Sequence, residues 1–357
     1  MSQSDLVIVI MAGGAGKRFW PLSTERCPKQ FLALFGDRSL LRMCYERIAG
    51  LVPPERVLAL TSHSHVGIVA RQLPELAREN VIGEPVRRDT AAAVSLAAFV
   101  CKRRFGNPVI ATLTADHLIT PADRFTKTLL SAVRAAEKGE ALYTLGVKPA
   151  SPSTAYGYLE RGPLAFDDDG IRHYTLNGFR EKPDIETARQ YVESGRYFWN
   201  SGMFVWRTDT IIEQIRTHLP GHAKALEPVG AAWGTGRWKP SLKKTFARLD
   251  TISIDYGVME RAPAVMCAEA DFSWNDVGGW NALEDILPAD DAENASRGTL
   301  VTLDSRGNLV YCENPDETVM TIGISDLVIV RAGKRTLVAH RDRVEDIKRL
   351  VDDHPDL

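Results

Sequence analysis

A glycine-rich loop with two basic residues is the first part of the sequence that is suited to chemistry. After an apolar run at Leu6–Met11, the chain continues Ala-Gly-Gly-Ala-Gly-Lys-Arg-Phe-Trp-Pro-Leu-Ser over residues 12–23. Glycines allow backbone N–H groups to approach phosphate oxygens, because no Cβ stands in the way. Lys17 and Arg18 add positive charge, and an arginine can bind two phosphate oxygens at once. The loop indicates a phosphate site, although a tight turn with incidental charges explains the glycines alone equally well.

Two common phosphate-binding loops do not fit these residues. The pattern G-x-x-x-x-G-K-[ST] requires a glycine where Met11 stands and a serine or threonine where Arg18 stands. The dinucleotide pattern G-x-G-x-x-G requires a third glycine where Phe19 stands. The sequence therefore argues against a P-loop NTPase and against a nicotinamide-dependent dehydrogenase.

Two aspartates, far apart in the sequence, are candidate metal ligands. Asp116 follows a predicted strand at Pro108–Thr114, and Asp276 lies in the segment Phe272–Trp280. Mg²⁺ is usually held by one or two carboxylates together with substrate phosphates and waters. Taken singly, each aspartate is more often a turn or cap residue, because Asp favours both places.

The elements that must position these residues alternate between strands and helices. Such alternation predicts an α/β fold with a mostly parallel sheet between helices, in which ligands bind beyond the carboxyl ends of the strands. Asp89 is a candidate N-cap for the third helix. The predicted strands are Leu6–Met11, Arg56–Thr61, Pro108–Thr114 and Ala141–Val147, and the predicted helices are 39–48, Val66–Ala77, Thr90–Arg104 and Pro121–Lys138.

The pattern changes twice along the rest of the chain. From about residue 155, strand-like runs alternate with helical stretches and predict a mixed sheet laid against the first half. A polar stretch after Pro288 then leads into short β-like runs and a terminal helical pattern at Asp342–Val351. We predict a catalytic domain over residues 1–288 and a small β-rich module over 289–357, for which a β-helix is one form. The strand-like runs of the middle part are Tyr156–Glu160, Tyr174–Phe179 and Phe198–Trp206, and its helical stretches are Ile185–Glu193 and Thr210–His218.

Composition narrows the class of protein. The 357 residues carry a formal net charge of −2, which gives no sign of a nucleic-acid partner. No apolar run approaches the roughly 20 residues that span a bilayer, and the start of the chain lacks the features of a signal peptide. The 5 cysteines are scattered and form no zinc-binding pattern. We expect a cytoplasmic protein that binds neither nucleic acid nor membrane.

The glycine loop, together with Pro28-Lys29-Gln30-Phe31, resembles the signature of the sugar nucleotidyltransferases and most closely that of the mannose-1-phosphate guanylyltransferases (GDP-mannose pyrophosphorylases). The resemblance implies a Rossmann-like nucleotidyltransferase fold. It also implies that the loop wraps a triphosphate and that Arg18 and Lys29 are the catalytic basic residues. The loop residues implied to bind nucleotide are Gly13, Gly14, Gly16 and Lys17.

Further segments match the same family in order, and the likeness extends over roughly residues 6–340. Glu84–Ala93 is similar to the nucleobase segment, which implies nucleotide contacts from Glu84, Asp89 and Thr90. The two aspartate segments are similar to the metal motifs, which implies Mg²⁺ on Asp116 and Asp276. We interpret His117 as structural or as orienting a ligand, because the incoming phosphate oxygen is already ionised and needs no general base. Ser253–Glu260 also matches, as structural support. The residues implied to bind the sugar phosphate are Gly157, Glu181, Lys182 and Asn200.

The reaction implied by this resemblance joins mannose 1-phosphate and GTP into GDP-mannose and pyrophosphate. One alternative keeps the fold and changes the base or the sugar, since one sequence does not settle either. Another is a catalytically silent paralogue that regulates an active partner, although intact Arg18, Lys29, Asp116 and Asp276 argue against it. The resemblance also favours a homodimer. Because little sequence follows residue 340, we expect no isomerase domain of the kind found in longer relatives.

Overall fold

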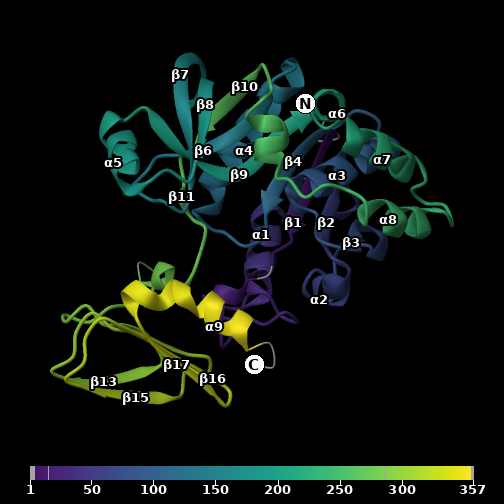
Figure 1. The fold of residues 1–357 in the computed structure, drawn as a ribbon. Helices are drawn as coiled ribbons and strands as arrows, with labels where there is room; N and C mark the ends of the chain where they lie inside the picture. Colours follow the sequence, from purple (N-terminus) through teal and green to yellow (C-terminus); the bar gives the residue numbers. More distant parts are fainter. Residues whose placement is uncertain (1–4, 15, 285, 355–357) are drawn as a thin grey trace. The chain divides into compact units, whose positions relative to one another are not determined.

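The computed structural model describes residues 5–14, 16–284 and 286–354 and divides into two compact units (Figure 1). The first unit comprises the chain up to Gly13 together with Leu41–Ala115 and Ile119–Trp274. The second comprises Gly14–Leu40, Asp116–Leu118 and Asn275–Leu357. Each unit is thus assembled from separate stretches of sequence.

One nine-stranded sheet forms the centre of the first unit. Strands β8 and β9 run against the other strands, so the sheet is mixed and mostly parallel, which confirms the predicted fold class. The later strands join the same sheet, with β9 between β4 and β6, instead of forming a second sheet laid against the first. In side-by-side order, the strands are β3 (Val81–Glu84), β2 (Val57–Ser62), β1 (Leu6–Ala12), β4 (Val109–Thr114), β9 (Tyr197–Arg207), β6 (Leu142–Val147), β10 (Val265–Glu269), β8 (Ile171–Glu181) and β7 (Gly157–Asp168).

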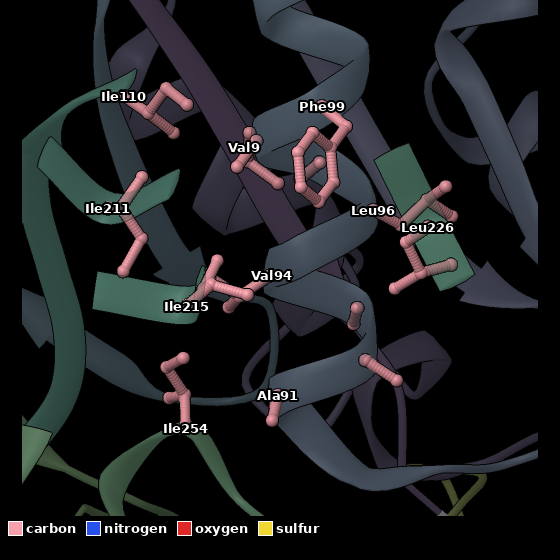
Figure 2. Close-up of a cluster of buried hydrophobic side chains, with 14 of the residues drawn as sticks. Val9, Ala91, Val94, Leu96, Phe99, Ile110, Ile211, Ile215, Leu226 and Ile254 are labelled. Atoms are coloured by element: carbon pink, nitrogen blue, oxygen red, sulfur yellow. The ribbon is translucent and has the colours of Figure 1, made fainter. Parts of the chain in front are cut away.

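The core of this unit lies between the sheet and an alanine-rich helix, α3 (Asp89–Phe105) (Figure 2). Small side chains allow α3 to pack closely against α6 and α7, and a Cβ at Gly230 would come within 2.5 Å of Phe99 Cβ. In the described part of the chain, no helix is both long and apolar enough to cross a bilayer. The other helices are α1 (Leu40–Ile48), α2 (Val66–Gln72), α4 (Ala122–Lys138), α5 (Ile185–Ser194), α6 (Thr208–His218), α7 (Pro220–Ala231) and α8 (Trp238–Phe246).

Most predicted elements are present, and the exceptions have local causes. Helix α2 ends at Gln72 and not at Ala77, because Pro74 disfavours a helical conformation of the residue before it. Helices α7 and α8 were not predicted. Two short strands, β5 (Leu118–Thr120) and β11 (Ser273–Asn275), also went unpredicted.

The second unit contains the β-rich module that the sequence predicts after residue 288. Strands β12, β14 and β16 pair in parallel, β17 closes that sheet in antiparallel fashion, and β13 pairs in parallel with β15. The 3₁₀ segment Arg341–Asp346 and helix α9 (Ile347–Asp353) follow. The strands are β12 (Ala295–Arg297), β13 (Thr299–Leu303), β14 (Leu309–Cys312), β15 (Thr318–Ile322), β16 (Leu327–Ala332) and β17 (Arg335–His340).

This second unit also holds the segment that follows the glycine loop. Phe19 and Leu34 are fully buried in one apolar cluster with Trp280 and Tyr311. Arg297 Nη1 donates to the carbonyl of Ala33 at 2.9 Å. Because residues 14–40 share a core with the C-terminal strands, the spatial units are not divided at residue 288. The predicted domain boundary is a division of the sequence and stays a prediction.

Candidate functional site

Lys29 joins the two aspartates that are candidate metal ligands. It lies in a 3₁₀ turn, Lys29–Phe31, and is only 8% exposed. Its Nζ is 3.0 Å from Asp116 Oδ2 and donates to the backbone carbonyl of Asp276 at 2.6 Å. A buried ammonium requires such partners, because an unpaired charge away from water is costly. Three predicted site residues from three sequence segments are therefore held together within the second unit.

The carboxylate of Asp116 is held in its charged form. Burial by itself would raise the pKa of Asp116, but the charge of Lys29, a contribution from His117 and accepted hydrogen bonds hold that pKa below its ordinary value. His117 Nε2 is 3.6 Å from Asp116 Oδ1, beyond hydrogen-bond distance. His117 thus lies beside Asp116, and its predicted role, either structural or in orienting a ligand, stays a prediction.

The glycine loop approaches Lys29 so closely that one glycine is required. Gly16 has φ +60°, and a Cβ there would lie 2.5 Å from the backbone nitrogen of Lys29. Gly14 also has a positive φ, +106°, while Gly13 shows no such requirement. The side chain of Lys17 lies outside the described part of the structure, so its predicted role stays a prediction.

Arg18 sits in the next turn, Lys17–Phe19, and meets a residue that sequence analysis missed. Its Nε is 2.8 Å from Glu345 Oε2, and its Nη1 donates to the carbonyl of Gly278 at 3.4 Å. Glu345 belongs to the 3₁₀ segment at the end of the chain. No spacing in the sequence relates positions 18 and 345, so only packing reveals this partner.

The carboxylate of Asp276 lies against a glycine. A Cβ at Gly278 would lie 3.2 and 3.3 Å from its two oxygens, so glycine leaves room for the carboxylate at this place. Among the described residues, no group of three or more His, Cys, Asp or Glu side chains is placed to hold a metal. Asp116 and Asp276 offer hard oxygen donors without such a cage, and this fits Mg²⁺, which takes few protein ligands and keeps substrate phosphates and waters.

In the first unit, three predicted sugar-binding residues gather where β7 begins at Gly157 and β8 ends at Glu181, beside Asn200 within β9. A Cβ at Gly157 would come 2.4 Å from Glu181 Oε2 and 3.5 Å from Asn200 Cβ, so glycine is required for the carboxylate to lie there. Asn200 Nδ2 donates to Asp255 Oδ1 at 2.7 Å, and Asn200 Oδ1 accepts from the backbone N–H of Gly202 at 3.1 Å. Both amide atoms of Asn200 are thereby fixed.

Lys182, the fourth predicted sugar-phosphate residue, projects from a strained backbone position. Its φ is +45°, a conformation that residues other than glycine rarely adopt and that clusters at functional sites. Its Nζ is 3.6 Å from Glu181 Oε1, and the side chain is 64% exposed. The ammonium is therefore accessible to a ligand and only loosely paired.

Asp255 is a further member of this cluster, and sequence analysis assigned its segment only a structural role. Burial, together with the charges of Glu181 and Asp89, raises the pKa of Asp255 to about 6, although the Asn200 amide opposes this rise. Asp255 begins a π-helix, Asp255–Met259, and such single turns often mark functional sites. Its segment matched the family, which was the available signal.

The predicted nucleotide-binding residues of the first unit lie around the start of α3. Burial and the charge of Asp89 raise the pKa of Glu84 to about 8, and its Oε1 has no hydrogen-bond partner among the described residues. Thr90 Oγ1 accepts from the backbone N–H of Ile254 at 2.8 Å, which anchors the segment of Asp255. Thr90 is therefore shown as a structural anchor, and a nucleotide contact from it stays a prediction.

Asp89 does not cap α3 in the predicted way. The helix begins at Asp89 itself, after Arg88, and Asp89 has φ +62°. Its Oδ1 accepts from the adjacent N–H of Thr90 at 2.7 Å, whereas a capping side chain reaches two or three residues ahead. The left-handed backbone turns the carboxylate toward the nearest amide, which accounts for the difference.

Comparison with known proteins shows the family to which this chain belongs. A family model described as nucleotidyl transferase matches residues 7–293, and one described as MannoseP isomerase/GMP-like beta-helix domain matches residues 298–353. Mannose-1-phosphate guanylyltransferase from Escherichia coli (strain K12) is 37% identical over 99% of this chain and 74% of its own length. The chain belongs to the mannose-1-phosphate guanylyltransferase family. Membership confirms the resemblance, the nucleotidyltransferase fold and the prediction of an enzyme.

Other members of the family agree with this assignment. Mannose-1-phosphate guanylyltransferase RfbM from Salmonella typhimurium is 39% identical over 96% of this chain and 71% of its own length. A crystal structure described as mannose-1-phosphate geranyltransferase from Thermus thermophilus has a TM-score of 0.87 at 36% identity, covering 98% of this chain and 99% of that one. The names of these relatives support synthesis of GDP-mannose, and the second family match confirms the predicted β-rich module as β-helix-like.

Proposed function

We propose that the protein transfers GMP from GTP to mannose 1-phosphate and releases pyrophosphate, with Mg²⁺ as its cofactor. The observation that carries this proposal is the position of Lys29, which bridges Asp116 and the backbone of Asp276. Such a site combines a buried cation with carboxylates and suits chemistry between two phosphate groups. Membership of the guanylyltransferase family supports the choice of base and sugar.

The residues of the second unit act on the phosphates in this proposal. The phosphate oxygen of mannose 1-phosphate is already ionised, so its in-line attack on the α-phosphorus needs no general base. Two anions must approach each other, and neutralising their charge is the main task. Lys29 and Arg18 stabilise charge on the α-phosphate and on the departing pyrophosphate, while the backbone N–H groups of Gly14 and Gly16 donate hydrogen bonds to phosphate oxygens.

Asp116 and Asp276 would hold the metal ion. Mg²⁺, when bound, supplies positive charge to phosphate oxygens and helps to orient them. The charged state of Asp116, maintained by Lys29, keeps one ligand ready for the cation. Glycine at position 278 leaves room for the carboxylate of Asp276 at its observed position.

The first unit supplies the groups proposed to recognise the nucleobase and the sugar. Guanine offers two adjacent N–H donors, and we propose that the carboxyl of Glu84, whose Oε1 has no hydrogen-bond partner among the described residues, accepts from one of them. Glu181 and Asn200 are proposed to bind sugar hydroxyls, because their polar atoms are held at fixed positions beside Gly157. Lys182 would bind the phosphate of the sugar through its exposed ammonium.

The test is to incubate the purified protein with Mg²⁺, mannose 1-phosphate and, in turn, GTP, ATP, UTP and dTTP, and to follow pyrophosphate. Release with GTP alone is expected. Release with another triphosphate would assign a different base, and release only with another sugar phosphate would assign a different sugar. Silence with every pair would favour the catalytically silent paralogue.

We also propose that the protein is a homodimer. One face of the paired strands β13 and β15 exposes four apolar side chains, and contiguous exposed apolar surface commonly marks an interface. Light scattering on the intact protein and on Met320→Glu tests this: a dimer that the charge converts to a monomer is expected, and a wild-type monomer at all concentrations contradicts it. The exposed side chains are Val301, Leu303, Met320 and Ile322.

A further inference from the structure

We propose that Glu345 is a positioning residue for the reaction, which holds the Arg18 guanidinium by its Nε edge and directs its remaining N–H groups to phosphate. The inference rests on the proposed catalytic role of Arg18. It assigns a part in the chemistry to the C-terminal module, which the proposed function leaves without one.

The contacts of Arg18 leave one side of its guanidinium accessible. Glu345 Oε2 lies 2.8 Å from Nε, and the carbonyl of Gly278 accepts from Nη1 at 3.4 Å. Among the described residues, Nη2 donates no hydrogen bond. A guanidinium has five N–H groups in a planar fork, so fixing the Nε edge sets the direction of the others.

Packing of the neighbouring apolar residues fixes the positions of Arg18 and Glu345. Phe19, next to Arg18, is fully buried, and Val344, next to Glu345, is 3% exposed. Both belong to one apolar cluster, which also contains Ile347 and Trp280. The two charged side chains therefore emerge from neighbouring points of the same core, and their backbones cannot move apart without opening it.

The segment of Asp276 is tied to the same turn. Asn281 Nδ2 donates to the carbonyl of Arg341 at 3.1 Å, and Arg341 also forms an ion pair with Glu284. The 3₁₀ segment that carries Glu345 thus contacts the chain just beyond the proposed metal ligand. Arg18 thus forms an ion pair with Glu345 of the module and donates a hydrogen bond to the carbonyl of Gly278 in the aspartate segment.

A glycine provides the space that this arrangement needs. A Cβ at Gly279 would lie 3.1 Å from Glu345 Oε1 and 4.0 Å from Arg18 Cβ. A larger residue at position 279 would therefore press on the carboxylate. This contact is independent of the ion pair and places Glu345 at the same point.

The pair is too exposed to serve mainly as a stabilising bond. The side chain of Arg18 is 51% exposed and that of Glu345 is 62% exposed. Ion pairs of this kind contribute little to folding. Removing the Glu345 carboxylate should therefore leave the free energy of unfolding nearly unchanged, while the Arg18 guanidinium would no longer be held in one orientation.

The experiment is a double-mutant cycle with Arg18→Ala, Glu345→Ala and both together. We expect Arg18→Ala to lower kcat by about two to three powers of ten. Glu345→Ala should lower kcat by about fivefold, with little change in KM for either substrate, and Glu345→Asp should restore part of the loss. In the Arg18→Ala background, Glu345→Ala should have no further effect, because an orienting residue has nothing left to orient.

Asp346→Asn is the matched control, since it removes a carboxylate from the next residue, where Asp346 forms an exposed ion pair with Arg343. It should leave kcat unchanged. Multiplicative losses in the double variant, or wild-type kcat in a folded Glu345→Ala protein, would overturn the role of Glu345. Near-normal turnover of Arg18→Ala would instead remove Arg18 from catalysis, so failure of the proposed function is distinguishable from failure of this inference.

Discussion

Two clusters of charged residues in this molecule shift the pKa of a carboxyl group in opposite directions. In the second unit, Lys29 lies against Asp116 and lowers the pKa of that carboxyl. In the first unit, Glu181 and Asp89 lie near Asp255 and help burial to raise its pKa to about 6. A cation–carboxylate cluster suits phosphates and a metal ion, whereas a crowded acidic cluster suits neutral hydroxyl groups. Asp116 and Asp255 are the same type of residue, so the groups around each carboxylate, and not the residue type, determine which ligand it suits.

The largest expected effect comes from removing the cation of the first of these clusters. Lys29→Ala should lower kcat by about three powers of ten, because it removes a charge donor and also leaves Asp116 without its partner. Pyrophosphate release measures this. Lys29→Arg keeps the charge in a larger side chain and serves as the comparison. Normal turnover by a folded Lys29→Ala protein would show that catalysis does not depend on the cation of this cluster.

The proposed metal ligand gives the next effect. Asp276→Asn should raise the Mg²⁺ concentration needed for half-maximal rate by about tenfold, since an amide is a weaker ligand than a carboxylate. A magnesium titration of the rate measures it. Asp271→Asn, which changes an exposed carboxylate in a surface ion pair, provides the control. An unchanged metal requirement would leave Asp276 as a turn residue.

A single added methyl group tests the role of the acidic cluster. Gly157→Ala should lower kcat/KM for mannose 1-phosphate by about tenfold, because the added Cβ would stand 2.4 Å from Glu181 Oε2 and displace it. The KM for GTP should stay the same. Gly170→Ala gives a control for this strand pair, since a Cβ there meets nothing within 4 Å; its positive φ makes thermal melting a necessary companion measurement. Equal losses toward both substrates would argue against a sugar-specific role.

The smallest expected effect is a pH-dependent gain in stability from Asp255→Asn. At pH ~3, Asp255 is protonated in both folded and unfolded chains and does not disfavour folding. As the pH rises from there through its folded pKa of about 6, the folded state loses stability relative to the unfolded state. The variant should therefore match wild type at pH ~3 and exceed it by about 1–2 kcal/mol above pH ~7, a value reduced for partial exposure.

Thermal or urea unfolding at several pH values measures this gain, and Asn can still accept the hydrogen bond from Asn200. Asp209→Asn, in an exposed ion pair with Lys102, should show no comparable gain. A gain that is constant with pH would mean that Asp255 is not protonated on folding.

Much of the fold follows from local pattern. The buried strand Leu6–Ala12 and the alanine-rich helix Asp89–Phe105 were predicted within one or two residues, because apolar periodicity and composition are local properties. The end of α2 was predicted too far along the chain, because Pro74 disfavours a helical conformation of Leu73, the residue before it. The joining of β9 between β4 and β6 was not predictable, since strand order depends on contacts between distant segments.

By itself, the sequence determined the glycine loop, the two aspartate segments and the family, because these are runs of particular residues in a particular order. The tertiary structure decided the rest. It placed Lys29 against Asp116 and against the carbonyl of Asp276, brought Asp255 to Asn200, and set Glu345 beside Arg18. The physical reason is that charge and hydrogen bonding act over a few ångströms in space, and positions far apart in sequence come within that range only when the core packs.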